Sequence, residues 1–341
     1  MTGPDLHSFL QALQEECGGV IPFERFMQEA LYHPRHGYYS ANIRSVGAGG
    51  DFSTSATLDP GLGKAIAAWI LKKAVNLGWK RVPVIEIGAG SGELARSVLH
   101  HLGWKNRWRI HYQIHETSPI LRSQQKNNLR WHRVRWIDSL PEALRKHRGR
   151  AIIFSNELVD AFACRLFVKG EDTWREIGVR IHPDGSLSEV LIGSIQNEAG
   201  LDAFSHLPTG QRVERHDSYR IWLDSWSKEW LEGSLLTIDY GDLAQSLYER
   251  RPGGSLRSYW KHARFSGMDL YARFGKQDLT ADVNFSDLID WGCRLGWQSG
   301  ALLTQSGFIA QMAGSSQAMS LSGLPDEAGE AFKVLEQSPL H

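Results

Sequence analysis

The spacing of hydrophobic positions changes near residue 80 of this 341-residue chain. Before that point apolar residues recur every three or four positions, which predicts helices over residues 5–16, 22–32 and about 60–77. After it, short apolar runs alternate with amphipathic segments. They predict strands over residues 82–87, 109–115, 134–137 and 151–154, with helices over 93–102, 119–127 and 141–146 between them. Such alternation is typical of a mostly parallel α/β sheet with helices on both faces.

The alternation ends after residue 164. Short segments separated by turn residues predict a β-ribbon over 164–193. Beyond it we expect a helix at 218–231, a buried strand at 234–239 and an irregular stretch at 241–284. The last part of the chain is predicted to form a helix at 285–295, a strand at 299–304 and helices near 306–313 and 325–336. In the helix over 218–231, the spacing of Trp222, Trp226 and Trp230 predicts rings that pack in the core.

The simplest organisation is one Rossmann-like core with additions to it. We expect an N-terminal helical cap over residues 1–79, a core over 80–313 with insertions at about 164–233 and 241–284, and a C-terminal helix and tail over 314–341.

The composition of the chain excludes some classes of binding partner and predicts its cellular compartment. The chain has 38 basic and 38 acidic side chains, so it offers no excess of positive charge for a nucleic-acid backbone, and we expect no nucleic acid as partner. No run approaches the roughly 18 apolar residues of a membrane span, so no membrane is expected either. The cysteines, Cys17, Cys164 and Cys293, fit neither a disulfide framework nor a metal site. With an acidic N-terminus that lacks a signal pattern, this predicts a cytoplasmic protein.

A glycine-rich turn after the 82–87 strand is the strongest local signal. Gly88, Ala89, Gly90 and Gly92 form a G-x-G-x-G pattern that opens the next helix, and Glu86 stands two residues before it. Glycines there allow positive φ and let a ligand approach the backbone. A dinucleotide-binding turn instead has Gly or Ala three positions after its second glycine. A tight turn without any ligand is the alternative.

Acidic residues also follow the next two strands. Glu116, followed by Thr117, stands where a ribose diol would need a carboxylate acceptor. Asp138, followed by Ser139, stands where an adenine amino group would lie, although a helix N-cap is an equally good interpretation of Asp138. Together with the glycine turn, this set predicts an S-adenosylmethionine (SAM) site.

Polar residues also end the 151–154 strand. Asn156, Glu157 and Asp160 follow it, at the sheet edge where α/β proteins bind ligands. Methyl transfer is an in-line displacement, so the protein mainly positions the nucleophile, and carboxylates suit a cationic nitrogen acceptor such as a guanidinium. The alternative is that Glu157 and Asp160 begin a helix and complement its dipole.

Ordered motifs over residues 21–336 resemble the MidA family of SAM-dependent methyltransferases, which includes a protein arginine methyltransferase. The motifs are Ile21-Pro22-Phe23, Gly37-Tyr38-Tyr39, Gly50-Asp51-Phe52-Ser53-Thr54-Ser55, the segment from Glu86 to Gly92, Glu116-Thr117-Ser118-Pro119 with Leu121, Arg122 and Gln125, Asn156-Glu157-Leu158 with Asp160-Ala161, Asp239-Tyr240-Gly241, the segment from Gly254 to His262, Asp278-Leu279-Thr280-Ala281 and the segment from Gly329 to Leu335.

The resemblance implies a class I methyltransferase with a seven-stranded sheet that binds SAM and methylates a nitrogen, by family an arginine of a partner protein. It adds Gly50 as a cofactor contact, and Asp51 and His262 as residues near the acceptor. The alternatives are a SAM-binding assembly factor without catalysis and an NAD-dependent oxidoreductase. The oligomeric state stays open, with a homodimer among the options. Departures from the family pattern are Ala56, Thr57, Ala163 and Asp282.

Overall fold

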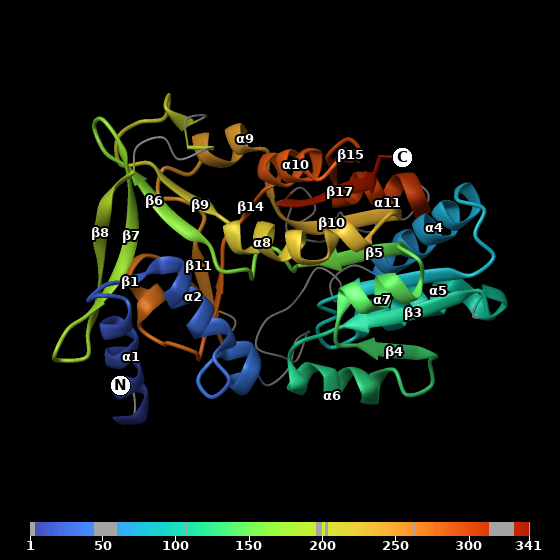
Figure 1. Cartoon of the computed structure of the whole chain (residues 1–341), viewed down its shortest axis with the longest axis horizontal. Coiled ribbons are helices and arrows are strands. Elements are labelled where there is room, and N and C mark those ends of the chain that lie inside the picture. The colour runs from blue at the N-terminus through green and yellow to red at the C-terminus, as the bar shows by residue number, and fades with distance from the viewer. Residues whose placement is uncertain are drawn as a thin grey trace. The chain divides into compact units, whose positions relative to one another are not determined.

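The computed structural model describes residues 4–43, 60–106, 108–195, 200–201, 204–261, 263–313 and 331–340 (Figure 1). The chain forms two compact units, each built from three segments. The cap unit comprises Met1–Ile43, Ala161–Tyr219 and Leu243–Asn284, and the core unit comprises Arg44–Asp160, Arg220–Asp242 and Phe285–His341. Part of the expected N-terminal cap over 1–79 therefore belongs to the core unit, since helix α4 (Pro60–Asn76) packs there.

The core unit is an α/β sheet with strand order β15-β17-β10-β5-β2-β3-β4. The strands are β2 (Val82–Ile87), β3 (Ile110–His115), β4 (Val134–Ile137), β5 (Arg150–Asn156), β10 (Glu232–Asp242), β15 (Trp297–Ser299) and β17 (Phe332–Pro339), and β16 (Leu303–Thr304) pairs with β17. From β10 to β4 all neighbours run parallel, whereas β17 runs antiparallel to β10. The predicted mostly parallel sheet is confirmed.

The predicted helix near 325–336 is wrong over its last residues. Phe332–Pro339 is strand β17, in which Leu335 pairs with Thr237 of β10. The local sequence suits a helix, but its apolar side chains Phe332, Val334 and Leu335 are buried in the sheet, so tertiary pairing overrides local preference. The C-terminal segment thus completes the core sheet rather than forming a separate helix.

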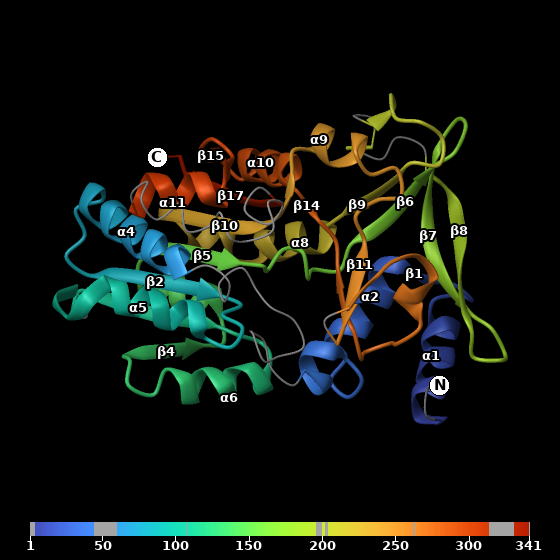
Figure 2. The same cartoon turned by 180° about the vertical axis from the view of Figure 1, so that it is seen from behind.

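Helices cover both faces of the core sheet. They are α4, α5 (Glu93–Asn106), α6 (Pro119–Asn128), α7 (Leu140–Lys146), α8 (Asp217–Trp226), α10 (Phe285–Arg294) and α11 (Gln305–Ala313). Helix α8 lies in front of the strands in Figure 1, and α4 lies in front of them in Figure 2.

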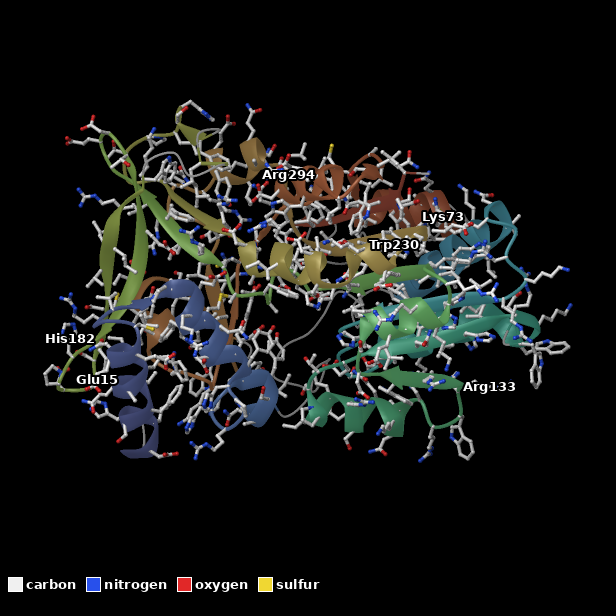
Figure 3. All side chains as sticks on the ribbon, viewed as in Figure 1. Glu15, Lys73, Arg133, His182, Trp230 and Arg294 are labelled. Carbon is white, nitrogen blue, oxygen red and sulfur yellow. The ribbon has the colours of Figure 1, made fainter. Side chains whose placement is uncertain are left out.

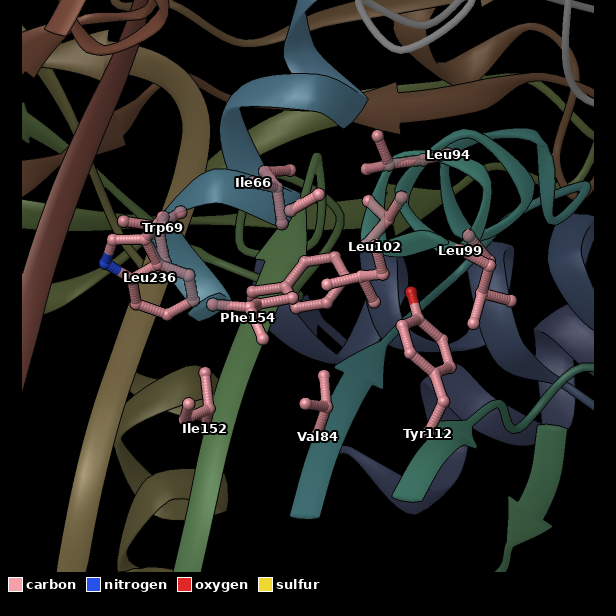
Figure 4. Packing of buried hydrophobic residues seen from close by; sticks show 14 of the residues in the cluster. Ile66, Trp69, Val84, Leu94, Leu99, Leu102, Tyr112, Ile152, Phe154 and Leu236 are labelled. Carbon is pink, nitrogen blue, oxygen red and sulfur yellow. The ribbon is translucent and has the colours of Figure 1, made fainter. Parts of the chain in front are cut away.

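One hydrophobic cluster joins α4, α5 and α11 to the strands. Trp69 of α4, Phe154 of β5 and Tyr112 of β3 are each at most 2% exposed, and Figure 4 shows these rings over the strands with Val84 and Leu236 nearby. Burying rings of this size is the main source of stability for the fold.

The tryptophans after Ser218 pack as predicted. The rings of Trp226 and Trp230 are buried and meet the ring of Trp297, whose centroid lies 6.0 Å and 5.1 Å away respectively. Trp230 donates its indole N–H to the carbonyl of Ala151, at 3.0 Å. Trp222 is half-buried and packs edge-on against Trp226. The helix itself ends at Trp226, earlier than expected, and a 3-10 turn over Ser227–Glu229 follows.

The cap unit contains helices α1 (Pro4–Glu16) and α2 (Phe23–Tyr32) and a sheet of order β1-β7-β6-β9. The predicted β-ribbon is confirmed as β6 (Arg165–Lys169), β7 (Trp174–Ile181) and β8 (Leu187–Ile195), with β1 (Ile21–Pro22) and β9 (Arg212–Arg215) beside them.

The interpretation of 241–284 as irregular is wrong. This stretch holds α9 (Ala244–Glu249) and a small antiparallel sheet of β11 (Arg257–Trp260), β12 (Ala263–Phe265) and β13 (Asp278–Thr280). Strands of three or four residues are too short to leave a clear alternation of apolar and polar positions.

Candidate functional site

Parallel strands of the core sheet end in line. The register pairs Ile137 of β4 with His115 of β3, His115 with Ile87 of β2, Ile87 with Ser155 of β5, and Asn156 of β5 with Ile238 of β10. The residues that follow these ends therefore share one sheet edge, which we call the carboxyl edge. The chain leaves β2 towards β3 on one side and reaches β5 on the other, so β2 is the topological switch point where α/β sheets bind ligands.

The glycine turn lies directly at this switch point. Gly88, Gly90 and Gly92 have φ of 68°, 54° and 84°, which favour glycine over residues with a Cβ. A Cβ on Gly88 would lie 2.9 Å from Cδ1 of Leu158, and one on Gly92 would lie 3.4 Å from Cγ of Gln125. Helix α5 begins immediately after the turn. The three glycines thus follow a backbone path at the switch point that residues with a Cβ would disfavour. Contact between this turn and a ligand stays a prediction.

Gln125 of α6 joins the glycine turn to Glu116. Its amide Nε2 donates to the carbonyl of Gly90 and to Oε2 of Glu116, both at 2.9 Å, and its Oε1 accepts from Nε1 of Trp136 at 2.9 Å. Its side chain is fully buried. In the sequence Gln125 is marked only as part of a family motif, and a polar residue on the buried face of a short helix is the signal for its role.

Glu116 is held as an acceptor at the end of β3. Its Oε1 accepts from the backbone N–H of Ser118 at 2.9 Å, and its Oε2 accepts from Gln125. Burial raises the pKa of Glu116, and the hydrogen bonds from Ser118 and Gln125 oppose that rise. Each carboxylate oxygen has a second lone pair, so the group keeps the capacity to accept hydroxyl groups of a ligand.

Glu86 lies buried below the turn, 2% exposed. Its Oε2 accepts a hydrogen bond from the hydroxyl of Tyr112 at 2.5 Å. Burial raises the pKa of Glu86 to about 8, and the charge of Glu116 adds to the rise, while the Tyr112 hydrogen bond opposes it. A carboxyl with such a pKa binds a proton near neutrality and releases it when a cation arrives nearby.

The other candidates after β3 and β4 are more exposed. Asp138 pairs with Arg122 while its side chain is 81% exposed, and the hydrogen bond from Arg122 lowers the pKa of Asp138. The N-cap of α7 is Ser139, whose hydroxyl accepts a hydrogen bond from the N–H of Glu142 at 3.4 Å. The interpretation of Asp138 as the N-cap of this helix is therefore wrong. Thr117 is exposed at the same edge.

The segment after β5 is an irregular loop, which we call the acceptor loop (residues 157–160). The next regular element is strand β6, so the interpretation of Glu157 and Asp160 as the start of a helix is wrong. Nδ2 of Asn156 donates to Oε1 of Glu157 at 2.9 Å. Glu157 has φ of 51°, a conformation shared by only two other non-glycine residues among those described. Such strain costs about 1–2 kcal/mol and concentrates at functional sites.

Asp239 of β10 holds the acceptor loop. Its Oδ2 accepts from the backbone N–H groups of Leu158, Val159 and Asp160, at 3.1, 2.8 and 3.4 Å. The side chain is fully buried, and burial together with the charges of Asp160 and Glu157 raises the pKa of Asp239. The sequence places Asp239 in a family motif but does not mark it as a site residue. An acid at the end of the predicted 234–239 strand is the available signal.

Gly50, Asp51, Ala56, Thr57 and His262 fall outside the described residues. Asp282 and Ala163 belong to the cap unit.

Asp282 is a buried partner for cations within the cap unit. It is 5% exposed and forms ion pairs with Arg257 and Arg251. Arg257 also donates from Nε to the hydroxyl of Tyr259 at 3.1 Å. Within the described ranges, no group of three or more His, Cys, Asp or Glu side chains is arranged to hold a metal ion, and no helix is long and apolar enough to cross a membrane.

Comparison with known protein families identifies the family to which the chain belongs. Residues 65–301 match a family of putative S-adenosyl-L-methionine-dependent methyltransferases. The chain belongs to this methyltransferase family. The resemblance to the MidA family is thereby confirmed, the cofactor is SAM, and the core unit is a class I methyltransferase fold. This result excludes the alternative of an NAD-dependent oxidoreductase.

Two curated relatives are similar over most of the chain. A protein from Caenorhabditis elegans named protein arginine methyltransferase NDUFAF7 homolog, mitochondrial, is 25% identical over 311 residues, covering 79% of this chain and 68% of the relative. The Danio rerio protein arginine methyltransferase NDUFAF7, mitochondrial, is 26% identical over 312 residues with the same coverage. The cytoplasmic location of this chain stays a prediction.

Two solved structures share the whole fold. A methyl transferase superfamily member from Burkholderia thailandensis, bound to S-adenosyl-homocysteine, has a TM-score of 0.84 at 28% identity over 99% of this chain and 94% of its own. A native crystal structure of a protein of the same superfamily from that organism has a TM-score of 0.81 at 27% identity, with the same coverage.

Proposed function

We propose that this methyltransferase transfers the methyl group of SAM to an arginine of a partner protein. The observation that carries the proposal is the acceptor loop, where Glu157 and Asp160 follow β5 at the carboxyl edge beside the glycine turn. Relatives named protein arginine methyltransferases support the same acceptor.

For the cofactor, we assign the turn from Gly88 to Gly92 to the methionine portion, Glu116 to the ribose and Asp138 to the adenine. The residues fit such a group because positive φ at three glycines keeps side chains out of the turn, and because Glu116 is held as an acceptor by Ser118 and Gln125. When bound, SAM supplies a methyl group made electrophilic by its sulfonium.

For the acceptor, we assign orientation of the guanidinium to the acceptor loop. Carboxylates at Glu157 and Asp160 pair with N–H groups of a guanidinium and fix its plane, which directs one nitrogen at the methyl carbon. That nitrogen forms the new N–C bond as the C–S bond breaks, and its proton passes to a carboxylate or to water. Asn156 positions Glu157 through the bond at 2.9 Å. The roles of Asp51 and His262 stay predictions from the family resemblance.

Labelling tests this proposal directly. Extract from cells that lack the chain is incubated with tritiated SAM and purified protein, and labelled proteins are hydrolysed for amino-acid analysis. We expect label in methylarginine with the wild type, a loss of about 100-fold or more with Glu157→Gln, and no loss with Glu171→Gln, an exposed control in the cap unit.

Other outcomes assign other functions. Label in a different amino acid would replace arginine as the acceptor. Tight SAM binding without transfer to any protein would favour the assembly factor without catalysis. Mass spectrometry of methylated peptides from cells with and without the chain then identifies the substrate.

A further inference from the structure

Three tryptophans are strongly exposed at the edge of the core sheet opposite the carboxyl edge. Trp104, Trp108 and Trp131 are 70%, 74% and 81% exposed. They lie at the end of α5 and in the turns that lead into β3 and β4, whose amino ends are neighbours in the parallel sheet. Arg133 joins the two turns, since its guanidinium lies 4.7 Å from the ring centroid of Trp108. Exposed aromatic groups gathered in this way mark an interaction surface.

The same turns are strongly basic. Residues 104–109 and 129–135 contain six Lys and Arg and no Asp or Glu. Lys105, Arg109, Arg130 and Arg133 are exposed, and none of the four pairs with a carboxylate in the part of the chain that the structure describes. In a chain without net charge, the core sheet is therefore polarised, with acids at its carboxyl edge and unpaired cations at its amino edge.

A Lys or Arg side chain lies over each of the three exposed tryptophan rings. Lys105 lies 6.0 Å from the ring of Trp104, Arg130 lies 5.3 Å from that of Trp131, and Arg133 covers Trp108. Beside them is a hollow lined by Leu99, Leu102, Ile110, His132 and Arg133. We call the region formed by residues 99–106, 108–110 and 129–133 the Trp–Arg surface.

A lipid interface fits the Trp–Arg surface best. Tryptophan is enriched where membrane meets water, because its ring prefers the headgroup region, and Lys and Arg there bind anionic headgroups. Single-stranded nucleic acid would instead need free ring faces for base stacking, and here one face of each ring is already covered by a cation.

We propose that the Trp–Arg surface docks the chain peripherally on a membrane that contains anionic phospholipids. The rings enter the headgroup layer while the cations contact lipid phosphates, and no spanning helix is needed. The carboxyl edge then faces away from the bilayer, so the methyl-transfer site stays open to a protein substrate. The sequence-based expectation of no membrane partner rested on the lack of a spanning segment, and a peripheral surface is compatible with that lack.

Vesicle binding tests this proposal. The full chain is mixed with phosphatidylcholine vesicles, with or without phosphatidylglycerol, and is followed by co-sedimentation and by tryptophan emission. We expect binding and a blue shift only with phosphatidylglycerol, both reversed by salt. Arg130→Glu with Arg133→Glu should lower the partition coefficient at least about tenfold. Trp108→Ser with Trp131→Ser should remove most of the blue shift.

A matched control changes the same charge elsewhere. Lys228→Glu with Arg294→Glu alters two exposed cations of the core unit, and Arg294 lies on α10 away from Arg133 in Figure 3. This control should keep vesicle binding, and all variants should keep the SAM affinity of the wild type, which shows that they are folded.

Three results would overturn the proposal. One is equal binding to vesicles with and without the anionic lipid, or none to either. Another is binding that the Arg130 and Arg133 changes leave intact. The third is tighter binding to a single-stranded RNA oligonucleotide than to anionic vesicles at the same ionic strength, which would assign the surface to nucleic acid.

Discussion

The carboxylate of Asp239 accepts a hydrogen bond from the backbone N–H of Val159, with 2.8 Å between Oδ2 and N. Asp239 belongs to β10 and Val159 to the acceptor loop after β5, so a residue 80 positions away fixes that loop. Leu158 of the same loop packs against Gly88, where a Cβ would lie 2.9 Å from its Cδ1. One carboxylate thus links the acceptor loop to the glycine turn.

Replacing this carboxylate should impair transfer more than cofactor binding. In Asp239→Asn, one oxygen is lost and three backbone N–H groups must share a weaker acceptor. We expect kcat for methyl transfer to fall about 10- to 100-fold, SAM affinity to change less than about threefold, and stability to fall by about 2 kcal/mol.

The neighbouring Asp242 provides the control. It also lies on β10 and pairs with Lys333 at 3.6 Å, while its side chain is 29% exposed. Asp242→Asn should leave kcat within about twofold of the wild type. Equal losses of kcat in the two variants would mean that Asp239 has no special positioning role.

Gln125 should act on the cofactor instead. Gln125→Leu removes the bonds to Gly90 and Glu116 and leaves both acceptors without their buried donor. We expect SAM affinity to fall about tenfold, measured by calorimetry, because Glu116 loses the group that fixes its orientation. Asn127→Leu, at an exposed position of the same helix, should keep the wild-type affinity, and an equal loss there would point to damage to the helix.

Glu86 should make stability depend on pH. Its pKa is raised from 4.5 to about 8 by burial, so the folded state keeps a proton that the unfolded state has lost between these values. The contribution of Glu86 to the free energy of unfolding is therefore largest below about pH 4.5. It decreases by up to about 1.4 kcal/mol for each pH unit above that value, and it becomes constant above about pH 8. The free energy of unfolding, measured with denaturant in the absence of SAM, should lack this decrease in Glu86→Gln. If the free energy of unfolding of the wild type and of Glu86→Gln depended on pH in the same way, this prediction would be contradicted.

Local patterns predicted the parts of the site that are close in sequence. The strand from Val82 to Ile87, the glycine turn and Glu116 follow from periodicity and from glycine chemistry within a few residues. The roles of Asp239 and Gln125 do not, because the groups they hold lie 80 and 35 residues away and depend on strand order. Strand β17 was missed for the same reason, since its pairing with β10 outweighs its local helical preference.

The most direct measurement compares two glycine variants for SAM binding by calorimetry. Gly88 and Gly78 have similar φ, 68° and 64°, so alanine strains the backbone in both, but only at Gly88 would the new Cβ meet a side chain, Leu158. The site assignment predicts that Gly88→Ala lowers SAM affinity at least about tenfold, whereas Gly78→Ala keeps it. Wild-type affinity in a folded Gly88→Ala protein would contradict the placement of the cofactor on this turn.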